Sequence, residues 1–128
     1  MGIFIGLSIL VIVLGVSIFF YFKKKPIIKG NPNTLYTEAL NALVRGDSDR
    51  AIQLLRDVVK QDTNHLNAYL QLGDILREDG NAQNAIKIHQ SLTVRPGLDE
   101  KLRIQIHQSL AQDYLNINDI PLAKKEAE

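Results

Sequence analysis

The longest stretch without a charged side chain lies at the beginning of the chain. Residues 3–22, IFIGLSILVIVLGVSIFFYF, are twenty residues without Asp, Glu, Lys or Arg. An α-helix rises about 1.5 Å per residue, so this stretch reaches about 30 Å, the thickness of the hydrocarbon core of a bilayer. A helix bonds its backbone polar groups internally, which suits it to lipid. The pattern predicts a transmembrane anchor over residues 1–22.

Two other interpretations of residues 1–22 fit less well. A cleaved signal peptide has a basic segment, then an apolar stretch of about 7–15 residues and a cleavage site of small residues. Here no Lys or Arg precedes the run, and it ends in the aromatic residues 19–22. A core helix of a globular domain has a polar face, whereas only Ser8 and Ser17 interrupt this run. A retained anchor is therefore favoured.

Basic residues follow the apolar run at once. Lys23, Lys24 and Lys25 open the segment KKKPIIK. Because Lys and Arg beside a membrane span stay on the cytoplasmic side, we expect the N-terminus outside and residues 23–128 in the cytoplasm. Pro26 and the string GNPN at 30–33 interrupt a helix that leaves the membrane. We assign residues 23–33 to a basic linker, with Asn33 or Thr34 as the N-cap of the next helix.

From residue 34 onward, helix-length segments alternate with turns. The turn residues lie at 46–47, 62–64, 80–81, 96–97 and 116–119. No segment combines a period of two with enrichment in β-branched residues, so no sheet is expected. The sequence predicts an all-α fold: one transmembrane helix followed by helix–turn–helix units.

These units repeat. Gly46, Ala51 and Ile52 recur 34 residues later as Gly80, Ala85 and Ile86, and a third copy aligns Asn118 and Ala123 at an offset of 38. A helix–turn–helix repeat of 34 residues is typical of tetratricopeptide repeats, which stack into an α-solenoid. We place the repeats at 34–64 and 66–99, with a partial copy at 101–128. The residues expected to pack the repeats are Tyr69, Leu72, Gly73, Gly80, Ala51, Ala85 and Ala123.

The third copy stops within its second helix. A single repeat cannot bury its apolar face, and about three are needed for stability. We therefore expect the chain to be part of a longer protein, with a partner that covers the apolar edge as the alternative.

Composition narrows the classes of function. The chain has 15 basic and 14 acidic residues and a net charge of +1, which argues against a nucleic-acid surface. It has no cysteine, so thiol catalysis and Cys-based metal sites are excluded. No phosphate-binding loop or nucleophile motif occurs, and we expect neither an enzyme nor a metal site or cofactor in this chain. The histidines His65, His89 and His107 lie in different elements and are expected to be structural.

In tetratricopeptide repeats the first helix of each hairpin lines the binding groove. The predicted partner-binding residues are polar and lie on the first helices of repeats two and three: Asn67, Gln71, Asp74, Arg77, Gln108 and Gln112. Such amides can bond a peptide, and an Arg can pair with a carboxylate. The alternative is an ordinary solvated helix face.

Several strings resemble one family more closely than the general repeat does. They are YTEALNALVRGDSDRAI at 36–52, YLQLGDILREDG at 69–80, AIKIHQSL at 85–92 and LAQDYLNINDIPLA at 110–123. They resemble the lipopolysaccharide assembly protein B family of the bacterial inner membrane. The resemblance implies an anchored adaptor that promotes degradation of the deacetylase LpxC by the membrane protease FtsH. It also implies a C-terminal rubredoxin-like metal module, whose cysteines this chain lacks.

Two alternatives stay open at this stage. A generic tetratricopeptide scaffold of another membrane complex, such as secretion, pilus or cytochrome-maturation machinery, fits the same repeats. The Gly2-xxx-Gly6 pair allows close approach of two helices, so a homo-oligomer is also open, although ordinary small residues explain the pair more simply.

The expected topology is directly testable. A fluorescent reporter that matures only in the cytoplasm, fused after Glu128, should be bright, because the lysines hold residues 23–128 inside. A phosphatase that is active only outside the cytoplasm should be inactive at the same position. An active phosphatase and a dark fluorescent fusion would reject this orientation.

Overall fold

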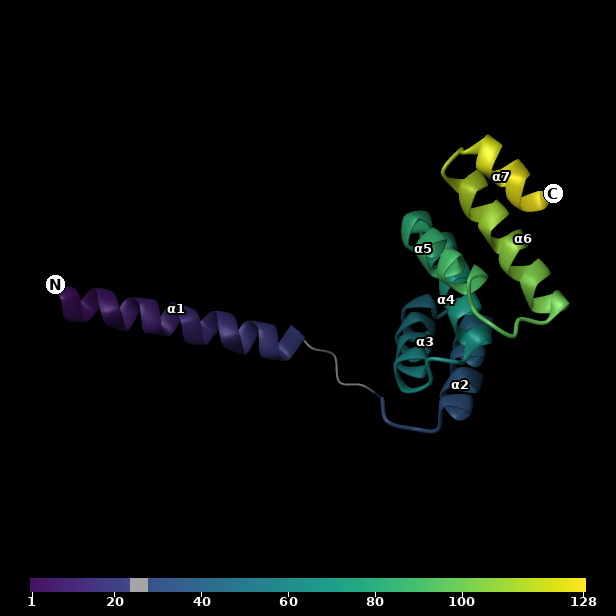
Figure 1. The fold of residues 1–128 in the computed structure, drawn as a ribbon. Helices are drawn as coiled ribbons and strands as arrows, with labels where there is room; N and C mark the ends of the chain where they lie inside the picture. The colour runs from purple at the N-terminus through teal and green to yellow at the C-terminus, as the bar shows by residue number, and fades with distance from the viewer. Residues whose placement is uncertain (24–27) are drawn as a thin grey trace.

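The computed structural model describes residues 1–23 and 28–128 (Figure 1). The described residues form helices and turns without a strand, which confirms the all-α prediction. The helices are α1 (Gly2–Lys23), α2 (Pro32–Val44), α3 (Ser48–Gln61), α4 (Leu66–Glu78), α5 (Ala82–Thr93), α6 (Glu100–Asn116) and α7 (Ile120–Ala127).

Helix α1 stands apart from the other helices (Figure 1). Its stretch Gly2–Tyr21 is long and apolar enough to cross a membrane, and none of it is buried against the rest of the chain. The hydroxyl of Ser8 donates back to the carbonyl of Phe4 at 2.9 Å, so this polar group is satisfied within the helix. Lys23 lies over the ring of Phe19, with the ammonium 5.0 Å from the ring centroid. The other two expected flanking lysines, Lys24 and Lys25, lie outside the described residues.

Helices α2 to α7 pair in chain order into three helical hairpins. Helix α2 packs against α3, α4 against α5, and α6 against α7. Successive hairpins stack through contacts of α3 with α4 and of α5 with α6, and α4 also touches α6 (Figure 1). The hairpins therefore stack in sequence, as the repeat pattern predicts.

The turn inside each hairpin has the same backbone geometry. Gly46, Gly80 and Asn118 have φ angles of 76°, 85° and 62°, the left-handed region that Gly and Asn tolerate best. After each of them, the next backbone N–H donates to the carbonyl five residues earlier: Asp47 to Ala42 at 2.9 Å, Asn81 to Leu76 at 2.7 Å, and Asp119 to Tyr114 at 2.8 Å. This is the Schellman end of a helix. The alignment of Asn118 with the two glycines thus has a structural basis.

The start of α2 differs from the expectation. Its N-cap is Asn31, whose side-chain oxygen accepts from the N–H of Asn33 at 2.9 Å, and neither Asn33 nor Thr34 takes that place. Pro32 occupies the first turn of the helix. There its missing N–H costs nothing and its fixed φ fits a helix. The predicted N-cap was wrong because a proline in the first turn of a helix does not interrupt it.

Two apolar clusters hold the stack together. The first lies among α2, α3, α4 and α5, and the second joins α4 and α5 to α6 and α7. Ala51, Ala85 and Ala123 are buried at equivalent positions of the three hairpins, where small side chains let two helices pack closely. Leu72 is buried in the first cluster. Tyr69 is half-buried and packs against the second cluster. On the outer face of the α6–α7 hairpin, Leu115 and Ile120 stay 47% and 41% exposed, the apolar edge expected from the partial copy.

Candidate protein-binding groove

A hollow of about 250 Å³ lies between the first helices of the second and third hairpins, α4 and α6. It is lined from α4 by Leu70, Gln71, Asp74 and Arg77, and from α6 by Gln105, Gln108, Ser109 and Gln112. We call this hollow the groove. Five of the six predicted partner-binding residues line it, whereas Asn67 is exposed on α4 outside it.

The rim of the groove is rich in amides. Gln105, Gln108 and Gln112 follow each other at three and four residues on α6, a spacing that places them on one face of the helix. Gln71 faces them from α4. An amide side chain both donates and accepts hydrogen bonds, as a peptide backbone does. This arrangement suits an extended or helical peptide laid along the groove.

Arg77 pairs its charge within the chain. Its Nη1 donates to Asp113 at 2.8 Å, to Asp74 at 3.0 Å and to the carbonyl of Ser109 at 3.3 Å. Only 16% of its side chain is exposed. Burial lowers the pKa of Arg77, but the hydrogen bond to Asp113 and the charges of Asp74 and Asp113 outweigh it and raise the pKa above its ordinary value. Arg77 forms the charged floor of the groove and ties α4 to α6.

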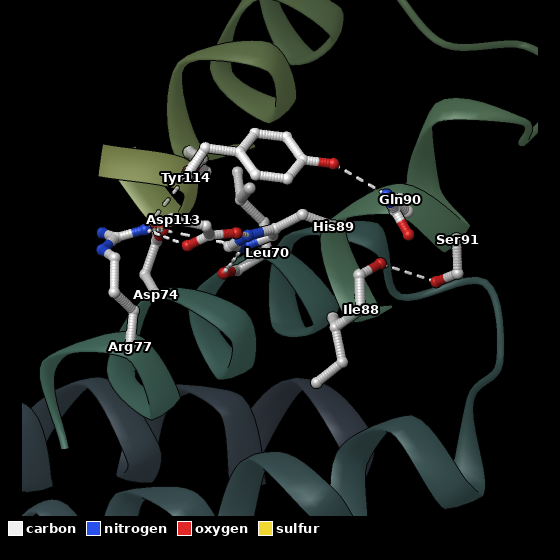
Figure 2. Close-up of polar contacts among 10 residues, drawn as sticks. Leu70, Asp74, Arg77, Ile88, His89, Gln90, Ser91, Asp113 and Tyr114 are labelled. Carbon is white, nitrogen blue, oxygen red and sulfur yellow. Dashed lines mark hydrogen bonds and ion pairs between the residues drawn. The ribbon is translucent and has the colours of Figure 1, made fainter. Parts of the chain in front are cut away.

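His89 of α5 lies next to Asp113 and Leu70 (Figure 2). Its Nδ1 lies 2.5 Å from Oδ2 of Asp113, and its Nε2 lies 3.2 Å from the carbonyl oxygen of Leu70. A carbonyl only accepts, so Nε2 donates to Leu70. Asp113 thus contacts Arg77 through Oδ1 and His89 through Oδ2, and so joins the two side chains.

We call Asp74, Arg77, His89 and Asp113 the ionic cluster. The side chains of His89 and Asp113 are fully buried, and each member of the cluster has a polar partner within it. Buried polar groups are tolerated when they are hydrogen-bonded in this way. The four side chains come from α4, α5 and α6, so the cluster fastens the third hairpin to the second directly beneath the groove.

The ionic cluster also explains why position 73 is glycine. A Cβ at Gly73 would lie 2.2 Å from Nε2 of His89, closer than any real contact. The sequence predicted a small residue here because two helices cross closely. The structure gives a more specific reason, which is that the imidazole ring occupies the space beside the α4 backbone.

Comparison with known proteins adds the family context. Over 80 residues, the chain is 35% identical to lipopolysaccharide assembly protein B of Escherichia coli strain K12, an alignment that covers 62% of this chain and 21% of the relative. The protein of the same name from Haemophilus influenzae is 26% identical over 88 residues, or 22% of its length. Over about three fifths of its length, this chain is therefore similar to lipopolysaccharide assembly protein B. No protein-family model matches it.

The chain spans about a fifth of the length of the lipopolysaccharide assembly protein B relatives. The resemblance inferred from the strings within residues 36–123 is confirmed by this homology. The names of these relatives concern lipopolysaccharide assembly.

Each of the three histidines has a hydrogen-bond partner within the chain. His65 caps α4, where its Nδ1 accepts from the N–H of Ala68 at 3.2 Å. His107 pairs with Glu126 of α7 through its Nδ1 at 2.6 Å. Across residues 1–23 and 28–128, no group of three or more His, Cys, Asp or Glu side chains is placed to hold a metal ion.

Sequence reasoning missed Asp113. In the string LAQDYLNIND it looks like one more polar residue of a solvated helix face, yet its exposure is 0%. Asp113 lies one residue before Tyr114, on the buried face of α6. A polar residue adjacent to that face can point toward a buried cation on a neighbouring helix.

The close approach of Gly73 to His89 predicts that the effect of Gly73→Ala on stability reverses when His89 is removed. Gly73→Ala should destabilise the fold by about 1–3 kcal/mol, because the new methyl group overlaps the buried ring. In a His89→Ala background the same substitution should stabilise by about 0.5–1 kcal/mol, the ordinary gain of Ala over Gly within a helix. Denaturant unfolding of the chain in detergent measures both effects.

The matched control is Asn84→Ala, at an exposed position of α5. This change should alter stability by no more than about 0.5 kcal/mol in either background. Equal destabilisation by Gly73→Ala with and without His89 would refute the steric explanation.

Proposed function

We propose that this chain is a membrane-anchored tetratricopeptide adaptor that binds other proteins in the groove between α4 and α6. In this proposal it acts in lipopolysaccharide assembly, by presenting the deacetylase LpxC to the membrane protease FtsH for degradation. It is not an enzyme, and this chain needs no cofactor of its own. The partners are proteins, and nucleic acid is not among them.

The observation that carries the proposal is the convergence of amide side chains from two hairpins on one hollow. Gln71 lies across from Gln108 and Gln112, and each can bond a peptide N–H or C=O. Beneath them the charges of Arg77 and Asp113 are already paired within the protein. A partner would therefore be recognised through hydrogen bonds to its backbone and through shape, rather than through a single exposed charge.

Helix α1 supplies the membrane part of the proposal. Its length and apolar composition suit a single span, and Lys23 lies at its C-terminal end. We propose that the span crosses the bacterial inner membrane with its N-terminus outside, which places the hairpins in the cytoplasm.

Homology supports the link to lipopolysaccharide assembly, because the relatives at 35% and 26% identity carry that name. The role of LpxC and FtsH is the part of the proposal that the family resemblance supplies. A generic scaffold of another membrane complex is the alternative function, and it shares the anchor, the hairpins and the groove.

Replacing three groove amides tests the binding surface. Gln71→Ala, Gln108→Ala and Gln112→Ala together should lower partner affinity about tenfold or more, because each lost hydrogen bond is worth about 0.5–1.5 kcal/mol. The unfolding midpoint should stay unchanged, since all three side chains lie outside the buried clusters. Capture of FtsH and LpxC from membranes by the detergent-solubilised chain provides the measurement.

The matched control is Gln83→Ala, an exposed glutamine on α5 that is not part of the groove. Capture by this variant should equal that of the unchanged chain. If the triple variant captures both proteins as well as the control does, the groove is not the binding surface. If the unchanged chain captures neither protein, the role in LpxC degradation is lost and the generic scaffold becomes the better account.

A further inference from the structure

The backbone just after the anchor is docked on the first hairpin. We call residues 28–30 the strap. The N–H of Ile28 donates to Oδ2 of Asp57 at 3.0 Å, and its carbonyl accepts from Nε2 of Gln61 at 2.9 Å. Asp57 and Gln61 are one turn apart on α3. Both polar backbone groups of Ile28 are thus held by one face of this helix.

Side-chain packing reinforces these two hydrogen bonds. Ile28 is half-buried against the first apolar cluster. A Cβ at Gly30 would lie 3.2 Å from the side chain of Leu35, so this part of the strap runs close to α2. The strap therefore touches both helices of the hairpin.

The burial of Asp57 indicates that docking of the strap is part of the fold. It is only 4% exposed, one of the few buried charged side chains in the described part of the chain. A carboxylate removed from water needs hydrogen-bond donors to be tolerated, and the N–H of Ile28 is such a donor. Asp57 has this partner only while the strap is docked on α3.

Docking the strap shortens the tether between membrane and hairpins. From Lys23 to Ile28 there are five Cα–Cα steps, which span at most about 18 Å. With an undocked strap, the nine steps from Lys23 to Pro32 would span up to about 32 Å. The docked strap thus reduces the reach of the first hairpin by almost half and fixes which side of it is attached.

We propose that the docked strap holds the stack of hairpins close to the membrane, with the Asp57–Gln61 side of α3 toward the anchor. We call this effect the mooring. The α4 helix packs directly against α3, and packed helices lie about 8–10 Å apart. The groove is then held within a few helix widths of the bilayer. This step rests on the proposed function: the groove then binds peptide segments that lie next to the membrane.

Insertions on the two sides of the strap test the mooring. The chain lacks cysteine, so a single cysteine at the exposed Lys87 of α5 can carry a donor fluorophore. The labelled chain is placed in lipid nanodiscs that contain acceptor-labelled headgroups. Energy transfer then reports the distance of the hairpins from the bilayer.

A flexible six-residue Gly-Ser insertion between residues 27 and 28 lengthens the tether by up to about 20 Å. It should lower the transfer efficiency. The same insertion between Gly30 and Asn31 should leave the efficiency unchanged, because the docked strap still sets the reach and so short an insertion adds little loop-closure entropy. An equal loss at both positions would overturn the mooring.

Substitutions at the docking site complete the test. In the chain with the insertion after Gly30, Asp57→Ala should lower the transfer efficiency as much as the insertion before the strap does. The control is Glu38→Ala, which removes an exposed carboxylate of α2 and should not change the transfer efficiency. If circular dichroism shows that Asp57→Ala unfolds the chain, Gln61→Ala takes its place. Unchanged transfer in the folded docking-site variant would overturn the role of α3. The groove takes no part in these measurements, so the mooring and the proposed function can fail independently.

Discussion

The hydrogen bond between His89 and Asp113, supported by Arg77, is the contact on which the arrangement of the hairpins depends. It lies fully buried where α4, α5 and α6 meet. Leu92 of α5 and Leu110 of α6 belong to the second apolar cluster, but apolar contacts tolerate small shifts of one helix along another. The hydrogen bonds of Asp113 to His89 at 2.5 Å and to Arg77 at 2.8 Å are directional and tolerate them less. The ionic cluster therefore sets the register of the third hairpin on the second.

The groove follows from that register. Because Arg77 turns inward to Asp113 and Asp74, the surface above it is left to amides from α4 and α6. The same glycine that makes room for the ring of His89 brings the α4 backbone close to α5. A displaced third hairpin would separate Gln71 from Gln108 and Gln112, so the proposed binding surface and the stability of the stack depend on the same contacts. The strap lies at the other end of the stack, against α3.

Periodicity carried the prediction of the fold. The long apolar helix α1 follows from an uninterrupted apolar run, and the hairpins follow from Gly46, Gly80 and Asn118, whose left-handed backbone recurs once in each hairpin. Five groove residues could be predicted because position within a repeated helix fixes the face on which a side chain lies. The ionic cluster and the strap could not, because each depends on contacts between segments 19 to 36 residues apart. Asp57 and Asp113 look like surface residues until the partner segment is in place.

The coupling between His89 and Asp113 tests the account most directly. Asp113→Ala alone should cost about 3–5 kcal/mol, because it leaves the buried Nδ1 of His89 without a partner and Arg77 with Asp74 as its sole counter-charge. In the double variant with His89→Ala, Arg77 and Asp74 stay balanced. A double-mutant cycle in the free energy of unfolding should therefore show a coupling of about 1–3 kcal/mol. The destabilisation of the double variant should be smaller than the sum of the two single destabilisations by that amount. Additive effects within about 0.5 kcal/mol would contradict the claim that this pair fixes the third hairpin.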